Sequence, residues 1–314
     1  MKRLLSVIVV SHDSRLALPR CLSSVFAQEV AEAPEVIVVD NGSGDGSADL
    51  VRREFPRARV LESPVNQGYA WANNRGIDAS EGRYVLLLND DAWLAPGCIA
   101  RLIDALDRHP DAASATPRIY RDAQKAVLDS TGIVLNKHRL RPYDRGEGEP
   151  AAGRYLDEEA VFGATGACAL YRRRALTALR VAGEFFDEDF FAYYEDVDLA
   201  WRAQVLGWKC VYVPAAEAFH ERRGPEGKPA AVKKRFLVNR YFCYVKNEVG
   251  ALAWRYLPLL LLIETGRMVR RLIAEPRLWG AIPHLVRLLP RMWYKREMVQ
   301  SRRTSSSDYL SRFR

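Results

Sequence analysis

The sequence has little cysteine, and its cysteines form no pattern typical of a disulfide framework or a zinc site. The chain of 314 residues has five of them, an odd number without any Cys-x-x-Cys pair: Cys21, Cys98, Cys168, Cys210 and Cys243. Small disulfide-stapled secreted domains and zinc ribbons are therefore excluded as classes, and a reducing cytoplasm is the expected setting.

Long apolar runs are also missing. The run Leu257–Ile263 is too short to span a bilayer unaided. The start, Met1–Val10, has two basic residues before an apolar run, as a signal peptide does, but it lacks a small-residue cleavage site and leads into Ser11-His12-Asp13. We interpret it as a first buried strand.

No glycine-rich loop follows that first strand. A Gly-x-Gly-x-x-Gly motif would be expected there in a dinucleotide oxidoreductase, and a Gly-rich phosphate loop in a sugar-phosphate nucleotidyltransferase. The sequence has Ser11-His12-Asp13-Ser14 at this place instead. Both enzyme classes are therefore disfavoured, although both share an α/β core.

The positive charge is concentrated in the last quarter of the chain. From Lys228 onward there are 19 Lys or Arg against 5 Asp or Glu, whereas the preceding residues have 28 against 34. Aromatic and leucine-rich stretches lie between these basic residues, a mixture typical of a membrane interface. We expect a basic amphipathic helical extension (226–314) on a membrane surface, the alternatives being a helical subdomain or homodimer face and, least favoured, a nucleic-acid site.

The first hundred residues alternate between apolar runs and amphipathic stretches. This alternation predicts βαβ units and a mainly parallel sheet flanked by helices, within an α/β domain over residues 1–225. The expected strands are 6–10, 35–39, 59–62 and 84–88, and the expected helices are 16–28, 48–54, 69–79 and 97–108. Residues 112–155 show less periodicity and contain Gly146-Glu147-Gly148-Glu149-Pro150, an expected mobile loop. Order is expected to return at 161–171, in a helix at 195–206 and in a strand at 209–213.

Acidic residues follow two of the predicted strands. Asp40 comes after Val36–Val39, and Asn89-Asp90-Asp91 comes after Tyr84–Leu88. Open α/β sheets bind ligands at the carboxyl ends of their strands, so these side chains are expected to share one crevice. The alternative for the triplet is a solvated turn that caps the next helix.

A second acidic cluster, Glu195-Asp196-Val197-Asp198, stands at the start of a predicted helix. Carboxylates at a helix start are often caps, which is the structural interpretation for Glu195 or Asp198. Asp198 and Arg202, four residues apart, also suit an ion pair. Asp196 remains as the candidate general base.

Taken together, four motifs in this order resemble family 2 glycosyltransferases of the GT-A (Rossmann-like) fold. They are Val38-Val39-Asp40-Asn41-Gly42-Ser43, Pro64-x-Asn66-x-Gly68 with Asn73 and Gly76, Asn89-Asp90-Asp91, and Glu195-Asp196-x-Asp198 with Arg202. The likeness runs from about Leu5 to His220. Gly163–Cys168 and Gly183-x-Phe185-x-Asp187-Glu188 make it most similar to the bacterial rhamnosyltransferase-like branch that builds cell-surface polysaccharides.

The resemblance implies roles for individual residues. Asp40 would contact the nucleotide base near Ser11 and Asn66, with Gly68 and Asn73 in the same donor-binding region. Asp90 and Asp91 would hold the ribose and a divalent metal on the diphosphate, and His220 is a candidate second metal ligand. Many relatives begin the triplet with Asp where this chain has Asn89, so metal binding is expected to depend mainly on Asp91.

The implied reaction is one inverting displacement, with Asp196 taking the proton of an acceptor hydroxyl. Charge on the leaving diphosphate calls for a hard cation with oxygen ligands, Mg²⁺ or Mn²⁺. We expect a nucleoside-diphosphate sugar donor, rhamnose on deoxythymidine diphosphate (dTDP) before hexoses on UDP. The acceptor would be a lipid-linked or polysaccharide glycan at the inner membrane face, and the alternative is a degenerate scaffold that assists assembly without catalysis.

Overall fold

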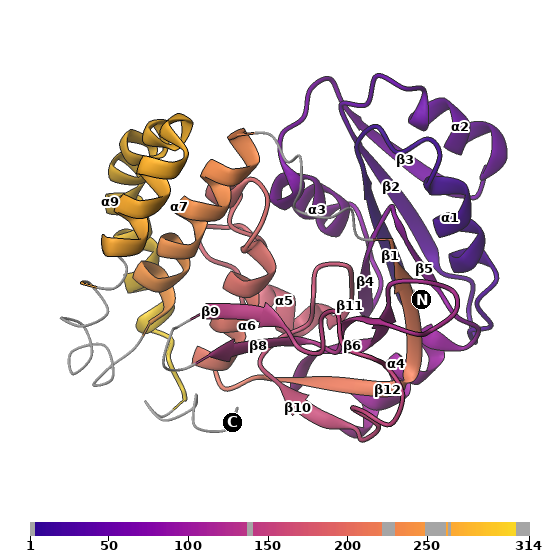
Figure 1. The fold of residues 1–314 in the computed structure, drawn as a ribbon. Coiled ribbons are helices and arrows are strands. Elements are labelled where there is room, and N and C mark those ends of the chain that lie inside the picture. Colours follow the sequence, from indigo (N-terminus) through magenta and orange to yellow (C-terminus); the bar gives the residue numbers. More distant parts are fainter. Residues whose placement is uncertain (1–3, 137–140, 222–229, 249–261, 263–264, 306–314) are drawn as a thin grey trace.

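The computed structural model describes residues 4–136, 141–221, 230–248, 262 and 265–305. A central sheet runs through the described part of the chain, with helices against both of its faces, and a group of C-terminal helices lies beside one end of it (Figure 1). None of the helices in these described ranges is both long and apolar enough to cross a membrane.

The first half alternates strands and helices as predicted. Its elements are β1 (Leu5–Ser11), α1 (Leu18–Phe26), β2 (Glu35–Asn41), α2 (Ser47–Glu54), β3 (Ala58–Ser63), α3 (Tyr69–Asp78), β4 (Tyr84–Asn89), β5 (Ala92–Leu94) and α4 (Cys98–Arg108). Strands β1, β2, β3 and β4 are mutually parallel, so their carboxyl ends meet at one edge of the sheet.

The second half continues the sheet and then becomes helical. Its elements are β6 (Ala112–Tyr120), β7 (Leu128–Ser130), β8 (Ile133–Asn136), β9 (Arg141–Asp144), β10 (Glu159–Val161), β11 (Cys168–Arg172), α5 (Arg173–Ala178), η1 (Glu188–Phe190), α6 (Glu195–Val205), β12 (Lys209–His220), α7 (Ala230–Asn247), η2 (Pro276–Gly280) and α9 (Ala281–Gln300). The strand order is β10-β12-β6-β11-β4-β1-β2-β3, with β5 on β12 and β7 on β6. Only β8 and β9, within the described ranges, pair outside this sheet.

The less periodic stretch 112–155 contains a central strand, β6, that the sequence did not predict. Strand β6 is buried along its whole length and lies inside the sheet between β11 and β12. Its residues Ala112-Ala113-Ser114-Ala115-Thr116 are small, so the apolar run that marks β1 or β4 is missing. Neighbouring strands, rather than its own side chains, supply the packing of β6.

Alternating side chains of β1 serve two hydrophobic cores. Val7 and Val9 face α1 and α4, whereas Ile8 and Val10 face the side covered by α3. Helix α3 approaches the sheet closely at Gly76, where an added Cβ would lie 2.4 Å from Ile8 Cγ2. The small residue thus allows α3 to sit directly over the middle of β1, the strand that leads to the candidate site.

A third core joins α6 to the C-terminal helices. Leu237, Phe242 and Met292 from α7 and α9 are buried with Val197 and Trp201 of α6. Helices α7 and α9 lie side by side in Figure 1 and contact each other and α6. The predicted helical character of the extension is present in the described residues, while most of the apolar stretch 257–263 lies outside them.

Candidate functional site

The strand ends bring Ser11 and Asp40 together. They are register partners at the carboxyl ends of β1 and β2, and both are buried. Asp40 Oδ1 accepts a hydrogen bond from Ser43 N at 2.9 Å. Three buried atoms here have no hydrogen-bond partner within the described part of the chain: Ser11 Oγ, Asp40 Oδ2 and Asn73 Oδ1. Buried polar atoms that lack a partner cost free energy, so this corner suits a polar ligand.

Asn66 and Gly68 shape the neighbouring loop. Asn66 Oδ1 accepts hydrogen bonds from Asn41 Nδ2 at 3.1 Å and from Gly68 N at 3.0 Å. Gly68 has a φ of +99°, and a Cβ there would lie 2.6 Å from Phe191 O. Asn66 and Gly68 are therefore both needed for the conformation of this loop, which lies against the segment that precedes α6.

The three residues of the acidic triplet have different partners. Asn89 Oδ1 lies 2.8 Å from the Tyr69 hydroxyl, while Asp90 Oδ2 accepts a hydrogen bond of 3.4 Å from His12 N. Asp91 Oδ1 lies 3.1 Å from His220 Nε2. Asn89, which stands where many family members have Asp, therefore makes a hydrogen bond with Tyr69, and Asp91 faces His220.

His220 stands between two carboxylates. Its Nδ1 is 2.8 Å from Oδ2 of Asp129, a fully buried residue of β7. Burial opposes the charged imidazolium, but the hydrogen bonds to Asp129 and Asp91 outweigh it and raise the pKa of His220 to about 9. A carboxylate behind a histidine fixes the ring orientation, as it does for many metal-ligating histidines.

The pair Asp91 and His220 fits a divalent cation that is shared with a diphosphate. Among the described residues no cluster of three or more His, Cys, Asp or Glu side chains is arranged to hold a metal. Mg²⁺ in phosphate-transfer sites is commonly bound by only one or two carboxylates, with substrate phosphates and water completing the shell. Ligation needs a neutral imidazole, so cation binding at His220 would release its proton.

Asp196 reaches the same region from the start of α6. Its Oδ2 accepts a hydrogen bond from Gly166 N at 3.0 Å, and Gly166 O lies 3.0 Å from the Tyr69 hydroxyl that contacts Asn89. Burial, followed by the charge of Asp144, raises the pKa of Asp196 to about 6. A carboxyl with this pKa is largely ionised at neutral pH and can accept a proton.

The capping interpretation of Glu195 and Asp198 was wrong. The N-cap of α6 is Tyr194, and no side chain caps it. Glu195 is buried, and burial together with the Asp196 charge raises its pKa to about 8. Asp198 is fully buried, with Arg202 Nε at 2.9 Å from its Oδ2, so the ion pair proposed from the spacing is present.

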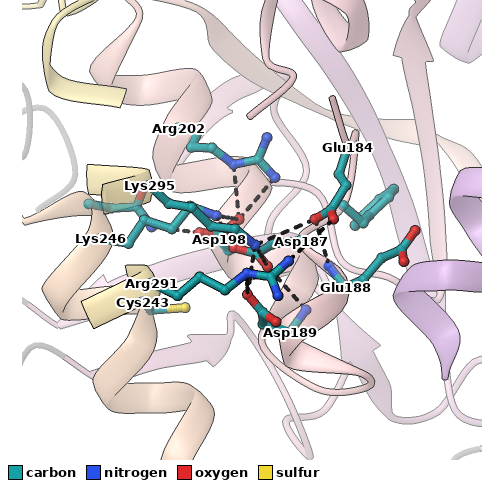
Figure 2. Close-up of polar contacts among 12 residues, drawn as sticks. Glu184, Asp187, Glu188, Asp189, Asp198, Arg202, Cys243, Lys246, Arg291 and Lys295 are labelled. Atoms are coloured by element: carbon teal, nitrogen blue, oxygen red, sulfur yellow. Dashed lines mark hydrogen bonds and ion pairs between the residues drawn. The ribbon is translucent and has the colours of Figure 1, made fainter. Parts of the chain in front are cut away.

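Asp198 belongs to a larger group of buried charges, which Figure 2 shows between α6 and the C-terminal helices. Lys246 Nζ of α7 lies 2.9 Å from Asp198 Oδ2 and 2.7 Å from Asp187 Oδ2. Lys295 of α9 pairs with Asp187 and lies 2.8 Å from Asp189 Oδ2. Burial opposes ionisation of Asp187, but the two lysines outweigh it and hold the pKa of this carboxyl well below its usual range.

The segment Phe190–Tyr194, which leads into α6, is held by α7. The side-chain amide of Asn239 donates to three carbonyl oxygens, those of Phe190, Ala192 and Tyr193, at 2.8, 2.9 and 2.8 Å. Phe191, Tyr193 and Tyr194 all have positive φ, at 60°, 71° and 71°. Such conformations are costly for residues other than glycine and persist when their surroundings fix them.

Four residues of this site were missed by sequence reasoning about chemistry: Tyr69, Asp129, Gly166 and Asn239. Tyr69 directly follows the Pro64-x-Asn66-x-Gly68 motif, and Gly166 lies within the Gly163–Cys168 motif. Their positions in the sequence therefore could have indicated a role in the site. Asp129 and Asn239 stand in no motif. Asp129 contacts His220, 91 positions away in the sequence, and Asn239 contacts residues 46 to 49 positions away, so neither role is visible in local spacing.

Comparison with known proteins gives similarity over most of this region. Residues 6–180 match the sequence model described as Glycosyl transferase family 2. The chain is 34% identical over 253 residues to the N-acetylglucosaminyl-diphospho-decaprenol L-rhamnosyltransferase of Mycobacterium tuberculosis, covering 74% of this chain and 80% of that protein. It is 28% identical to an N-acetylglucosaminyltransferase of Sinorhizobium fredii, covering 68% and 51%.

Solved structures share the fold. The mannosyltransferase PcManGT from Pyrobaculum calidifontis, in complex with GDP-Man and Mn²⁺, aligns with a TM-score of 0.57 at 18% identity, covering 99% of this chain and 86% of that one. GalNAc-T7 with UDP, GalNAc and Mn²⁺ aligns with a TM-score of 0.61 at 14% identity, covering 78% and 48%. The predicted GT-A fold is confirmed by this likeness.

Proposed function

The chain belongs to glycosyl transferase family 2, and on that basis we propose that it transfers a sugar with inversion from a nucleoside diphosphate to a lipid-linked acceptor. The observation that carries the proposal is the short chain of contacts from Asn89 through Tyr69 and Gly166 to Asp196. These contacts connect Asn89, which directly precedes Asp90 and Asp91, with Asp196, a carboxyl of raised pKa, and so support a shared site.

Asp196 is the general base in this proposal. It accepts the proton of the acceptor hydroxyl as that oxygen attacks the anomeric carbon and the bond to the diphosphate oxygen breaks. Attack on the face opposite the leaving group inverts the configuration. Glu195 is less suited to the task, because its pKa of about 8 keeps it mostly protonated at neutral pH.

The remaining predicted residues bind the donor. Ser11, Asp40 and Asn73 offer the unpaired buried atoms for the nucleoside, together with Asp90, and the loop of Asn66 and Gly68 supports this donor-binding region. Asp91 and His220 would hold Mg²⁺ or Mn²⁺, whose charge stabilises the leaving diphosphate. Because the similar mycobacterial enzyme is a rhamnosyltransferase, rhamnose is the first donor sugar to test, and we propose dTDP as its carrier, with UDP-hexoses second.

A lipid-linked acceptor requires a membrane nearby, and we assign attachment to α9. One face of this helix exposes Pro283, Val286, Pro290 and Trp293, which recur at helical spacing. Val286 is 61% exposed and Trp293 58% exposed. Tryptophan amid arginines suits the headgroup layer of an anionic bilayer, so the proposed location is the cytoplasmic face of the inner membrane.

The attachment is tested by sedimentation with phosphatidylglycerol vesicles. Trp293→Glu should reduce binding, and high salt should weaken wild-type binding. Leu16→Glu is the matched control, since Leu16 is 96% exposed and lies just before α1 in the other half of the molecule. Equal binding of Trp293→Glu and wild type would contradict the assignment, and a loss of dimers in Trp293→Glu would favour a homodimer face instead.

The catalytic proposal is tested by calorimetry with UDP, dTDP and GDP, with and without Mn²⁺. We expect one nucleotide to bind in a metal-dependent manner and Asp91→Asn to weaken that binding. Asp196→Asn should bind the nucleotide normally and transfer no sugar. Failure of folded wild-type protein to bind any nucleotide would overturn the proposal.

A further inference from the structure

A partly buried arginine, Arg235, lies on α7, and no carboxylate in the described ranges pairs with it. The Arg235 guanidinium carbon is 3.5 Å from the centroid of the Phe191 ring. No carboxylate of the residues that the structure describes forms an ion pair with Arg235, and burial alone lowers the pKa of its guanidinium. Lys233, two residues earlier on the same helix, has by contrast a carboxylate partner, Glu275, at 2.8 Å.

Phe191 places this cation beside the candidate active site. Its backbone oxygen accepts a hydrogen bond of 3.0 Å from Ala70 N at the start of α3. Its ring packs against Gly68, where an added Cβ would meet the ring at 2.7 Å. The Phe191 ring therefore contacts both Arg235 and the donor loop, and Phe191 itself precedes the proposed base by five residues.

Aromatic surface adjoins the cation. Phe236 is 38% exposed, and its ring lies 4.4 Å from the ring of Tyr193 and 5.9 Å from that of Tyr194. Other cations are close, because Arg287 and Arg235 both contribute, after burial, to the lowered pKa of His284. The region thus combines aromatic faces, which suit a sugar ring, with guanidinium donors, which suit phosphate oxygens.

We propose that Arg235, together with Phe236 and Tyr193, forms the acceptor subsite and binds the diphosphate of a lipid-linked sugar. This inference rests on the proposed function. The donor diphosphate is assigned to the strand ends at Asp91 and His220. Arg235 is on α7, which packs against α9, the helix that has the exposed apolar face. A lipid tail at α9 and a sugar near Asp196 leave the connecting diphosphate next to α7.

The experiment compares Arg235→Gln with Lys233→Gln. Both variants remove one positive charge from α7, and of the two residues Lys233 has a carboxylate partner within the described part of the chain. The acceptor probes are a prenyl-diphosphate-linked N-acetylglucosamine and an alkyl glycoside of the same sugar without phosphate. The donor side is measured separately as the dissociation constant of the nucleoside diphosphate with Mn²⁺.

We expect Arg235→Gln to raise KM for the diphosphate acceptor by about tenfold or more, since hydrogen bonds to charged groups are strong. Nucleotide affinity and KM for the alkyl glycoside should stay within about twofold, Arg235→Lys should recover part of the loss, and Lys233→Gln should match wild type. An unchanged KM in Arg235→Gln would overturn the inference while leaving the proposed transferase intact. Equal weakening of nucleotide binding would also overturn it, because Arg235 would then serve the donor.

Discussion

Lys246 Nζ lies 2.9 Å from Asp198 Oδ2, and both side chains are fully buried (Figure 2). Asp187 Oδ2 is a second partner of the same ammonium, at 2.7 Å. The helix whose first turn contains the proposed base is thus tied to α7 by fully buried charges. Coulombic attraction is strong in such surroundings, and so is the penalty for leaving one charge unpaired.

Lys246→Met should therefore destabilise the protein strongly. Removal of the Lys246 ammonium takes one of two cationic partners from each of the buried carboxylates Asp187 and Asp198, at a cost of about 3–5 kcal/mol in the free energy of unfolding. Lys233→Met is the control, because the exposed pair of Lys233 and Glu275 is worth at most about 1 kcal/mol. Urea denaturation measures both variants, and equal midpoints would contradict the assigned role of Lys246.

Asn239→Ala should slow transfer while sparing donor binding. The variant loses the three hydrogen bonds that hold the strained segment Phe190–Tyr194, so Asp196 would be presented less accurately. Misplacement of a catalytic group by about 1 Å can cost on the order of a hundredfold in rate. We expect a fall in kcat with unchanged KM for the donor and an unchanged nucleotide dissociation constant. A rise in donor KM alone would show that the segment serves nucleotide binding instead.

The rate of transfer should fall as the pH is lowered through about 6. Asp196 accepts a proton only when ionised, and its pKa is raised to about 6 by burial and then by Asp144. Asp144→Asn removes that negative charge, which makes ionisation of Asp196 easier, so the acidic limb of kcat/KM should move to lower pH. An unshifted limb would mean that another group controls it.

Asp129→Asn should weaken metal-dependent nucleotide binding. Asp129 is fully buried and lies 2.8 Å from His220 Nδ1, so it orients the candidate ligand. Loss of such a supporting carboxylate typically costs about 10- to 100-fold in metal affinity. Calorimetric titration with Mn²⁺ measures the effect, with nucleotide binding in the absence of metal as the control. Identical Mn²⁺ affinities would argue that His220 is not a ligand.

Local sequence patterns predict most of the fold and part of the candidate site. Strands such as β1 and β4 are predictable because their own side chains form continuous apolar runs, and parallel strand ends then place Ser11, Asp40 and Asn89 at one edge. The pair Asp198 and Arg202 is predictable because residues four apart share a helix face. These features depend on spacing within one element.

Other features depend on contacts that spacing does not encode. Strand β6 takes its burial from neighbours in the sheet rather than from its small side chains. Lys246 and Lys295 are 48 and 108 positions away from the carboxylates they meet. In the sequence they are two of the 19 basic residues of the tail, and only packing separates these buried lysines from the exposed arginines.

The buried lysines also limit how the protein can be recombined with its relatives. A chimera joined ahead of α7 would place a foreign helix over Asp187 and Asp198, and it would fold only if that helix brought ammonium groups to the same depth. Exchange of acceptor specificity by swapping the C-terminal helices therefore requires these charges to be transplanted as a set, with the crossover point upstream of Asp187.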